Sequence, residues 1–341
     1  MAIIDKPSDY FNTVLYTGNS STQSITGVEF QPDFTWIKAR NQAYNHFLFD
    51  AVRGVQKRIK TNSTDAESTV TGLTSFDTDG FGLGSNVDMN GSGVNFESWN
   101  WKAGGTASSN TDGSITSSVS ANQDAGFSIV SYTGTETNAT VGHGLGVAPK
   151  VVIVKKTSGT GDWYVYHGAI SGMSGGYITL NNTDGFYTNV TTFWNGDHSS
   201  TVVDLGSNNN SNGSSDNMIA YCFAEKQGYS KFGSYTGNGN ADGTFVYTGF
   251  SPAFIMIKCT DLARVWRMWD NKRDAINPNT ANLQAQASDA EYDDPAVSID
   301  FLSSGFKVRS TDSSYNGSGN SYIYMAFAEQ PLVGDNPATA R

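Results

Sequence analysis

The stretch that could most readily bind a ligand is Phe193-Trp194-Asn195-Gly196-Asp197-His198. It places a tryptophan among polar side chains in a loop, and loops of this composition form many sugar-binding surfaces. We therefore predict Trp194, Asp197 and His198 as candidate binding residues. Tryptophan is usually buried, however, and the simpler interpretation is that Trp194 folds back over its own domain.

Catalysis has weaker support in the sequence. Glycoside hydrolysis needs two carboxyl groups that flank the scissile bond, and the obvious candidates are Asp293-Asp294 and the pair Asp77 and Asp79. Acidic side chains in loops are more often simply solvated. The sequence contains no nucleophile elbow, phosphate-binding loop, HExxH motif or paired-cysteine motif. We expect a protein that is not an enzyme, with no catalytic residues, no metal ligands and no cofactor.

The composition predicts an all-β protein. The chain has 341 residues with 37 glycines and 8 prolines, and Ser, Thr and Asn crowd the gaps between short apolar runs. A formal net charge of −11 argues against nucleic acid or an anionic membrane as a partner, because either would require clustered Lys and Arg. Cys222 and Cys259 are the only cysteines, and we expect both to be buried and unreactive. No apolar stretch of the sequence predicts a signal peptide or a transmembrane segment.

A seven-residue pattern that occurs three times organises the chain. It begins at Pro32, Pro149 and Pro252, each time leads through an apolar run, and ends in a lysine. A short apolar run rich in β-branched and aromatic residues is typical of a strand covered on both faces, and proline is tolerated where such a strand begins. We interpret each copy as the central strand of a repeated domain.

Further anchors recur at nearly fixed distances from these prolines. A Tyr-Thr-Gly tripeptide precedes each proline, and an aromatic-rich strand that ends at Asp50, His167 or Asp270 follows it. Arg53 and Arg273 come three residues after the two aspartates, so that each Asp and Arg could pair and close a turn. His167 breaks this pattern, which excludes one catalytic role common to all three copies.

Each copy also contains a strand that runs into a Thr-Asp or Ser-Asp turn, followed in two copies by Glu67 or Glu291 with the spacing of a capping box. A single helical turn is expected there. An Asn-Gly-Ser tripeptide then leads into a last strand with alternating apolar residues, and Asn-Gly favours the positive φ of a hairpin turn. We expect Trp99 and Trp101 in that strand to fill the core.

These anchors divide the chain into three domains: residues 1–104 with an N-terminal arm, 105–227 with a linker, and 228–341 with a C-terminal tail. Each should be an antiparallel, jelly-roll-like β-sandwich of about seven or eight strands. The segment 104–110 has the composition of a flexible linker. The first domain should therefore be free to take its own orientation, whereas the second and third are joined tightly.

Several of these runs resemble repeat domains in structural proteins of marine tailed bacteriophages, usually called tail fibre or minor structural proteins. The likeness covers nearly the whole chain. The runs are Tyr16-Thr17-Gly18-Asn19, Phe34-Thr35-Trp36-Ile37-Lys38, Phe49-Asp50-Ala51-Val52-Arg53-Gly54, Asp79-Gly80-Phe81, Trp99-Asn100-Trp101-Lys102-Ala103-Gly104-Gly105, Gly228 through Gly237, and Tyr322 through Glu329.

The resemblance implies a non-enzymatic virion component assembled in the host cytoplasm, and it transfers no catalytic or binding site. We expect a tail-associated, homo-oligomeric protein that binds other virion proteins and a host-surface glycan, without nucleic acid and without membrane insertion. Two alternatives stay open at this point: a capsid decoration protein, and a glycan-binding or glycan-degrading spike.

Overall fold

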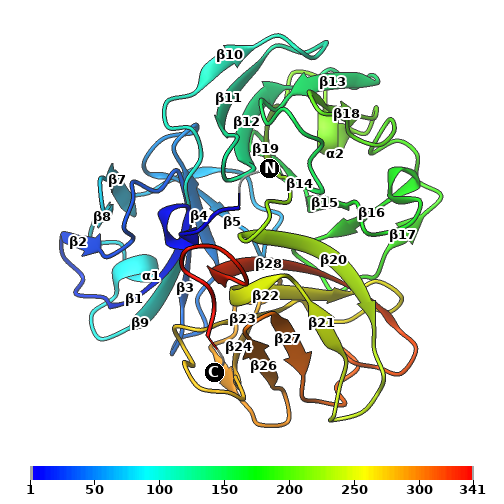
Figure 1. Ribbon diagram of the computed structural model, residues 1–341. Helices are drawn as coiled ribbons and strands as arrows, with labels where there is room; N and C mark the ends of the chain where they lie inside the picture. The colour runs from blue at the N-terminus through cyan, green and yellow to red at the C-terminus, as the bar shows by residue number, and fades with distance from the viewer. Residues whose placement is uncertain (1–2, 340–341) are drawn as a thin grey trace.

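The computed structural model describes residues 3–339 and is built almost entirely from antiparallel strands, which confirms the predicted all-β class (Figure 1). Residues 1–2 and 340–341, which belong to the predicted arm and tail, lie outside the described residues. The arm contains a short 3-10 helix, Pro7–Asp9.

In the described part of the chain the three copies hold nine, ten and nine strands, somewhat more than expected. The first copy contains β1 (Phe11–Thr17), β2 (Gln23–Thr26), β3 (Phe34–Ala39), β4 (Phe47–Asp50), β5 (Lys57–Lys60), β6 (Ser68–Thr69), β7 (Leu73–Asp77), β8 (Gly80–Leu83), α1 (Val87–Asn90) and β9 (Asn95–Trp101). The second contains β10 (Ser108–Asn110), β11 (Ser117–Asn122), β12 (Phe127–Thr133), β13 (Ala139–Gly142), β14 (Val151–Lys156), β15 (Trp163–His167), a 3-10 helix (Met173–Gly175), β16 (Gly176–Thr179), β17 (Tyr187–Thr188), β18 (Val202–Leu205), α2 (Asn209–Asn212) and β19 (Asn217–Phe223). The third contains β20 (Ser230–Thr236), β21 (Phe245–Tyr247), β22 (Phe250–Cys259), β23 (Arg267–Asp270), β24 (Ala281–Gln284), β25 (Tyr292–Asp293), β26 (Ile299–Leu302), β27 (Gly305–Val308) and β28 (Ser321–Pro331).

Each copy has one large and one small sheet, with the same strand order in its large sheet. That order is β1-β9-β3-β4-β5-β6 in the first copy and β20-β28-β22-β23-β24-β25 in the third. The second copy repeats it and adds β10 and β11 at one edge. The central strands β3, β14 and β22 are buried at every position, as their apolar runs predicted. Pro252 lies within β22 at an irregularity in the strand pairing, rather than at the strand's start.

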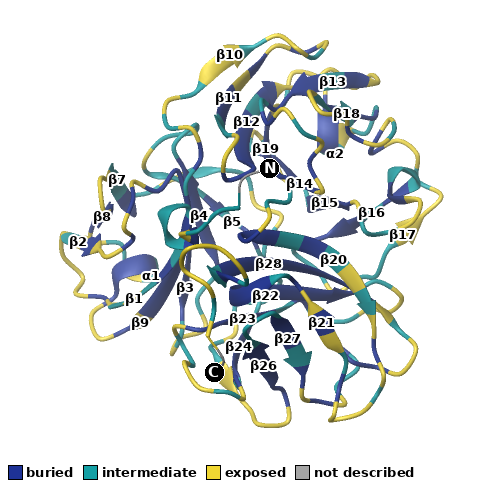
Figure 2. Cartoon of the chain, in the orientation of Figure 1, coloured by how far each residue is buried: buried dark blue, intermediate teal, exposed yellow. Residues whose placement is uncertain are grey.

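One shared core, rather than three independent ones, lies at the centre of the molecule (Figures 1 and 2). Between the two sheets of each copy lies a local apolar cluster, as in a β-sandwich. The opposite faces of the three large sheets meet in a single cluster that includes Trp36, Trp99, Ile153, Trp163 and Met256. The expectation that the first copy takes its own orientation is therefore wrong, because its large sheet buries this face only against the other two.

The three pattern-ending lysines join the copies head to tail. Lys155 Nζ of the second copy donates to Thr64 O of the first, at 3.0 Å. Lys258 Nζ donates to Thr183 O, at 2.9 Å, and Lys38 Nζ closes the ring by donating to Ser288 O, at 3.2 Å. The acceptors are the turn residues that the sequence places five positions after Ile59, Ile178 and Leu283.

A second ring of hydrogen bonds uses the residues at the start of the aromatic strands. Trp163 Nε1 donates to Lys60 O and Trp266 Nε1 donates to Thr179 O, both at 2.9 Å. At the equivalent position His46 Nε2 lies 3.1 Å from Gln284 O. The same bond thus recurs at each of the three boundaries between copies.

The Tyr-Thr-Gly and Asn-Gly motifs of a copy contact each other. Tyr16 Oη donates to Met89 O, and a Cβ on Gly18 would lie 2.3 Å from Gly91 O, so only glycine fits there. Gly91 itself has φ −62°, so the prediction of a positive-φ Asn-Gly hairpin turn is wrong. Instead, Asn90 ends the short helix α1, and its side-chain amide donates to Gly84 O.

Two more local expectations are wrong. The segment 104–110 is ordered: Gly104 N donates to Ser120 Oγ, and β10 pairs with β11 along the sheet edge. No helical turn forms at Glu67 or Glu291, since both carboxylates accept bonds from arginine side chains instead. Tertiary partners thus override the local capping signal.

Candidate functional site: a pocket where the chain ends meet

The predicted binding residues Trp194, Asp197 and His198 do not form an open site. Trp194 is 1% exposed and His198 is 7% exposed, and both pack with Tyr166 in the local core of the second copy. Asp197 is exposed and accepts a 2.9 Å bond from Tyr166 Oη. The binding hypothesis for Trp194 is therefore corrected, because a buried ring cannot stack on an external sugar.

The acidic pairs considered for hydrolysis serve as loop acceptors. Asp79 accepts from the backbone amides of Gly27 and Glu29, and Asp294 accepts from Ala296 N. Asp293 accepts a 2.5 Å bond from Thr280 Oγ1. These contacts stabilise turns and do not aim two carboxyl groups at a common point.

The densest group of charges lies where the third copy meets the first. Arg273 Nε lies 2.6 Å from Asp270 Oδ2 and 2.7 Å from Glu97 Oε2, with all three side chains fully buried. Burial raises the pKa of Glu97 well above its ordinary value, because an ionised carboxylate loses its hydration there, and the charge of Arg273 opposes this effect. Burial alone would also raise the pKa of Asp270, but Arg273 and the hydrogen bond with Glu97 bring it below its ordinary value.

This group is structural because solvent and substrate cannot reach it. The Asp–Arg pairs predicted in the first and third copies are confirmed, with Nε–Oδ2 distances of 2.6 Å at Arg53 and Arg273. Each aspartate also accepts a bond from the neighbouring copy: Tyr221 Oη donates to Asp50 Oδ2, and Trp99 Nε1 donates to Asp270 Oδ2. The pairs therefore fix the boundaries of the ring.

The histidines and cysteines are equally internal. Burial lowers the pKa of His167 to about 4 and that of His198 to about 3. Both cysteines are buried and unpaired, as predicted, and burial raises the pKa of Cys222 to about 12. None of these groups is placed to act on an external substrate.

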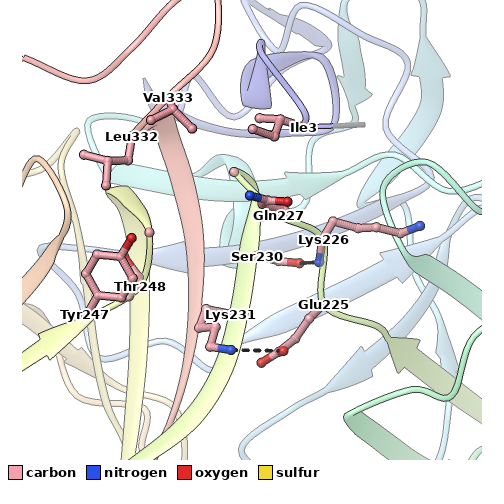
Figure 3. A pocket seen from close by; sticks show the side chains of 12 residues that line it. Ile3, Glu225, Lys226, Gln227, Ser230, Lys231, Tyr247, Thr248, Leu332 and Val333 are labelled. Atoms are coloured by element: carbon pink, nitrogen blue, oxygen red, sulfur yellow. Dashed lines mark hydrogen bonds and ion pairs between the residues drawn. The ribbon is translucent and has the colours of Figure 1, made fainter. Parts of the chain in front are cut away.

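A pocket of about 440 Å³ lies where the two ends of the chain cross the junction between the second and third copies (Figure 3). Ile4 N donates to Gln227 O, and Leu332 N donates to Gly249 O, so both ends are bonded to the pocket walls. Tyr247 and Val333 line one side, and the junction segment that begins at Glu225 lines the other.

Exposed aromatic residues on β21 distinguish this place from its counterparts. The ring of Tyr247 is 60% exposed, and Phe245, two residues earlier on the same face, is 47% exposed. Strand pairing places Ser24 and Thr26 at these positions in the first copy, on β2 opposite β8. In the second copy the equivalent residues are Thr140 and Gly142.

The comparison of the three copies shows whether the fold itself requires aromatic residues at these positions. Two copies build the same strand with small or polar residues, so the fold does not require aromatic rings there. An exposed apolar surface beside a pocket is typical of a binding site. A faint signal was present in the sequence, since Phe245 and Tyr247 flank Val246, but period-two alternation does not tell which of the two faces of the strand is covered.

The described residues 3–339 contain no group of three or more His, Cys, Asp or Glu side chains that could hold a metal ion. Among them there is also no helix long and apolar enough to cross a membrane.

Comparison with known proteins places the chain by family alone. Neither a curated protein nor a solved structure matches it. One family profile, described as a domain of unknown function (DUF7483), matches residues 6–331 and therefore spans all three copies together. Because this profile covers most of the sequence, the chain belongs to the DUF7483 family.

Proposed function

We propose that this protein is a non-enzymatic structural component of a tailed-phage virion, associated with the tail and adhesive in action. It would bind other virion proteins through its surface and attach to a glycan on the host. The family resemblance of its repeated runs motivates the virion assignment.

The observation that carries an adhesive role is the contrast between a densely hydrogen-bonded interior and the exposed aromatic residues beside the Tyr247 pocket. The boundaries between copies are held by the same lysine and aromatic-position hydrogen bonds around one core. Such a body holds surface loops in fixed positions, and several copies on a particle would convert weak contacts into avidity. The ionisable groups of the core make structural contacts, which suits a scaffold better than a catalyst.

Immunogold electron microscopy of purified particles tests the proposal. Antibodies raised against the recombinant chain should label the tails of phage particles whose genome encodes it, and mass spectrometry should find the chain in particles purified by density gradient. Label on the capsid would instead support a decoration protein. Absence of the chain from purified particles would overturn the virion assignment.

A separate assay tests the non-enzymatic part. Purified protein incubated with host-surface polysaccharide should leave its size distribution unchanged in size-exclusion chromatography. Depolymerisation would support the glycan-degrading alternative and contradict our proposal.

A further inference from the structure

The pocket beside Tyr247 offers two kinds of wall to a ligand (Figure 3). On one side stand the exposed ring of Tyr247 and the apolar side chains of Leu332 and Val333. On the other side the walls are polar and come from the junction segment 225–231. A ligand that fills this space needs one apolar face and one face rich in hydrogen-bonding groups.

The polar side presents an acceptor and a donor next to each other. Lys231 Nζ lies 3.1 Å from Glu225 Oε2, and this ion pair is partly open, with Lys231 42% and Glu225 26% exposed. Glu225 Oε1 accepts a 2.9 Å bond from Phe232 N, which holds the carboxylate in place. The exposed side chain of Gln227 adds an amide to the same wall.

We propose that this pocket binds a neutral pyranose unit of a glycan. The C–H face of a pyranose is apolar and packs on aromatic rings, while its equatorial hydroxyl groups each donate and accept hydrogen bonds. Tyr247 would take the ring face, and the Glu225–Lys231 pair would bond neighbouring hydroxyl groups. A volume of about 440 Å³ lies within the usual range for small-ligand sites.

The charge of the pocket favours a neutral sugar over an acidic one. Glu225 and Lys231 neutralise each other, and Lys226, the other cation that lines the pocket, extends away from Tyr247 in Figure 3. The whole chain carries −11, which repels an anionic glycan at long range. Phe245 extends the apolar surface along β21 and could pack against a second sugar unit.

This inference rests on the proposed adhesive function and names its ligand. Its test is saturation-transfer-difference NMR on the full chain with two sets of probes. The neutral set contains the methyl glycosides of glucose, galactose, mannose and N-acetylglucosamine, and the acidic set contains those of glucuronic and galacturonic acid. We expect transfer to at least one neutral glycoside, with the strongest signals on ring protons of one face.

The decisive variant is Tyr247→Thr, which installs the residue that the first copy carries at this position. It should reduce the transfer signal at least five-fold while the melting temperature stays unchanged. Tyr292→Ala is the matched control, because Tyr292 is also an exposed tyrosine, 42% accessible, on an edge strand of the same copy. That control should keep the wild-type signal.

Lys231→Asn should weaken binding of the neutral glycoside without loss of the fold. It again installs the residue of the first copy, where Asn12 occupies the equivalent position. The inference is overturned if no neutral glycoside gives transfer, if the acidic set binds more strongly, or if Tyr247→Thr binds as wild type. Immunogold labelling of particles is independent of all these results, so a failure here leaves the virion assignment standing, and the reverse also holds.

Discussion

Two boundaries of the ring share the same hydrogen bonds but differ in charge. One lies between the third and first copies, and the other lies between the second and third. At the first of these, Arg273 contacts Glu97, and Arg40 forms a two-bond ion pair with Glu291, at 3.0 and 2.8 Å. At the second, Phe186 stands in place of Glu291, and its amide donates to Thr260 O.

The aspartate position shows the same contrast. In the third copy Asp270 receives a hydrogen bond from Trp99 of the first copy. In the second copy the equivalent residue is His167, whose Nε2 lies 3.1 Å from Tyr324 O of the third copy. The acceptor Asp270 thus faces the N–H donor of Trp99, and the donor His167 faces the carbonyl of Tyr324.

The difference follows the path of the chain. The second and third copies are consecutive and are joined by a junction of a few residues, whereas the third and first meet only through space. A buried ion pair stabilises little in net terms but is costly to break, which makes it a device for specific pairing. We infer that the charged boundary selects the correct closing partner, and the tethered boundary does not need it.

The largest effect is expected from Arg273→Met. The substitution leaves Asp270 buried without its counter-ion at the boundary that closes the ring, and should cost about 3–5 kcal/mol in the free energy of unfolding. Urea unfolding followed by tryptophan fluorescence measures it. Arg53→Met is the matched control at the equivalent position, where Ile219 replaces Glu97, and it should cost less. Equal losses would contradict a special role for the closing boundary.

His167→Asp should cost about 3 kcal/mol, because it buries a carboxylate against Tyr324 O with no arginine three residues later. The double variant His167→Asp with Ile170→Arg restores the Asp–Arg pair of the other copies and should recover part of that loss in the same urea assay. If the single variant is as stable as wild type, donor–acceptor matching at this boundary is not what fixes the residue type.

Acid should weaken the boundary between the second and third copies through His167. The pKa of His167 is lowered to about 4 in the folded protein, so below pH 6.5 the unfolded chain binds a proton that the folded chain does not. Stability is therefore lost as pH falls from about 6.5 to 4, by up to about 3 kcal/mol from this residue. His167→Gln keeps a donor but does not titrate, and it should flatten the pH dependence of the melting temperature. An unchanged slope would argue against a neutral, buried His167.

Tyr247→Thr should have the smallest effect on folding, within about 0.5 kcal/mol, since it changes an exposed side chain to one that the same strand carries in another copy. Differential scanning calorimetry of wild type and variant is the measurement. A drop in melting temperature of several degrees would mean that Tyr247 serves the fold and is not reserved for a ligand.

Much of the interior could be predicted because it repeats. Three spaced copies of one pattern identified the buried central strands, the Asp–Arg pairs and the core position of Trp99. These predictions depend on periodicity and on pairing between residues three positions apart, and both can be recognised from the residue types in the sequence. The candidate site failed at Trp194 because a tryptophan among polar neighbours has the same sequence signature whether its ring is outside or folded under the loop.

The sequence by itself determined the all-β class, the threefold repetition of the motifs and the buried central strands. Only the tertiary structure decided that the copies share one core and close into a ring. The reason is that Lys38, Lys155 and Lys258 donate hydrogen bonds to backbone carbonyls of a neighbouring copy. Every residue has a backbone carbonyl, so the residue type does not reveal which one is the acceptor. Alternation likewise shows that a strand has a buried face, but it does not show which copy covers that face. Only the packed structure therefore shows that the side chain of Tyr247 stays exposed.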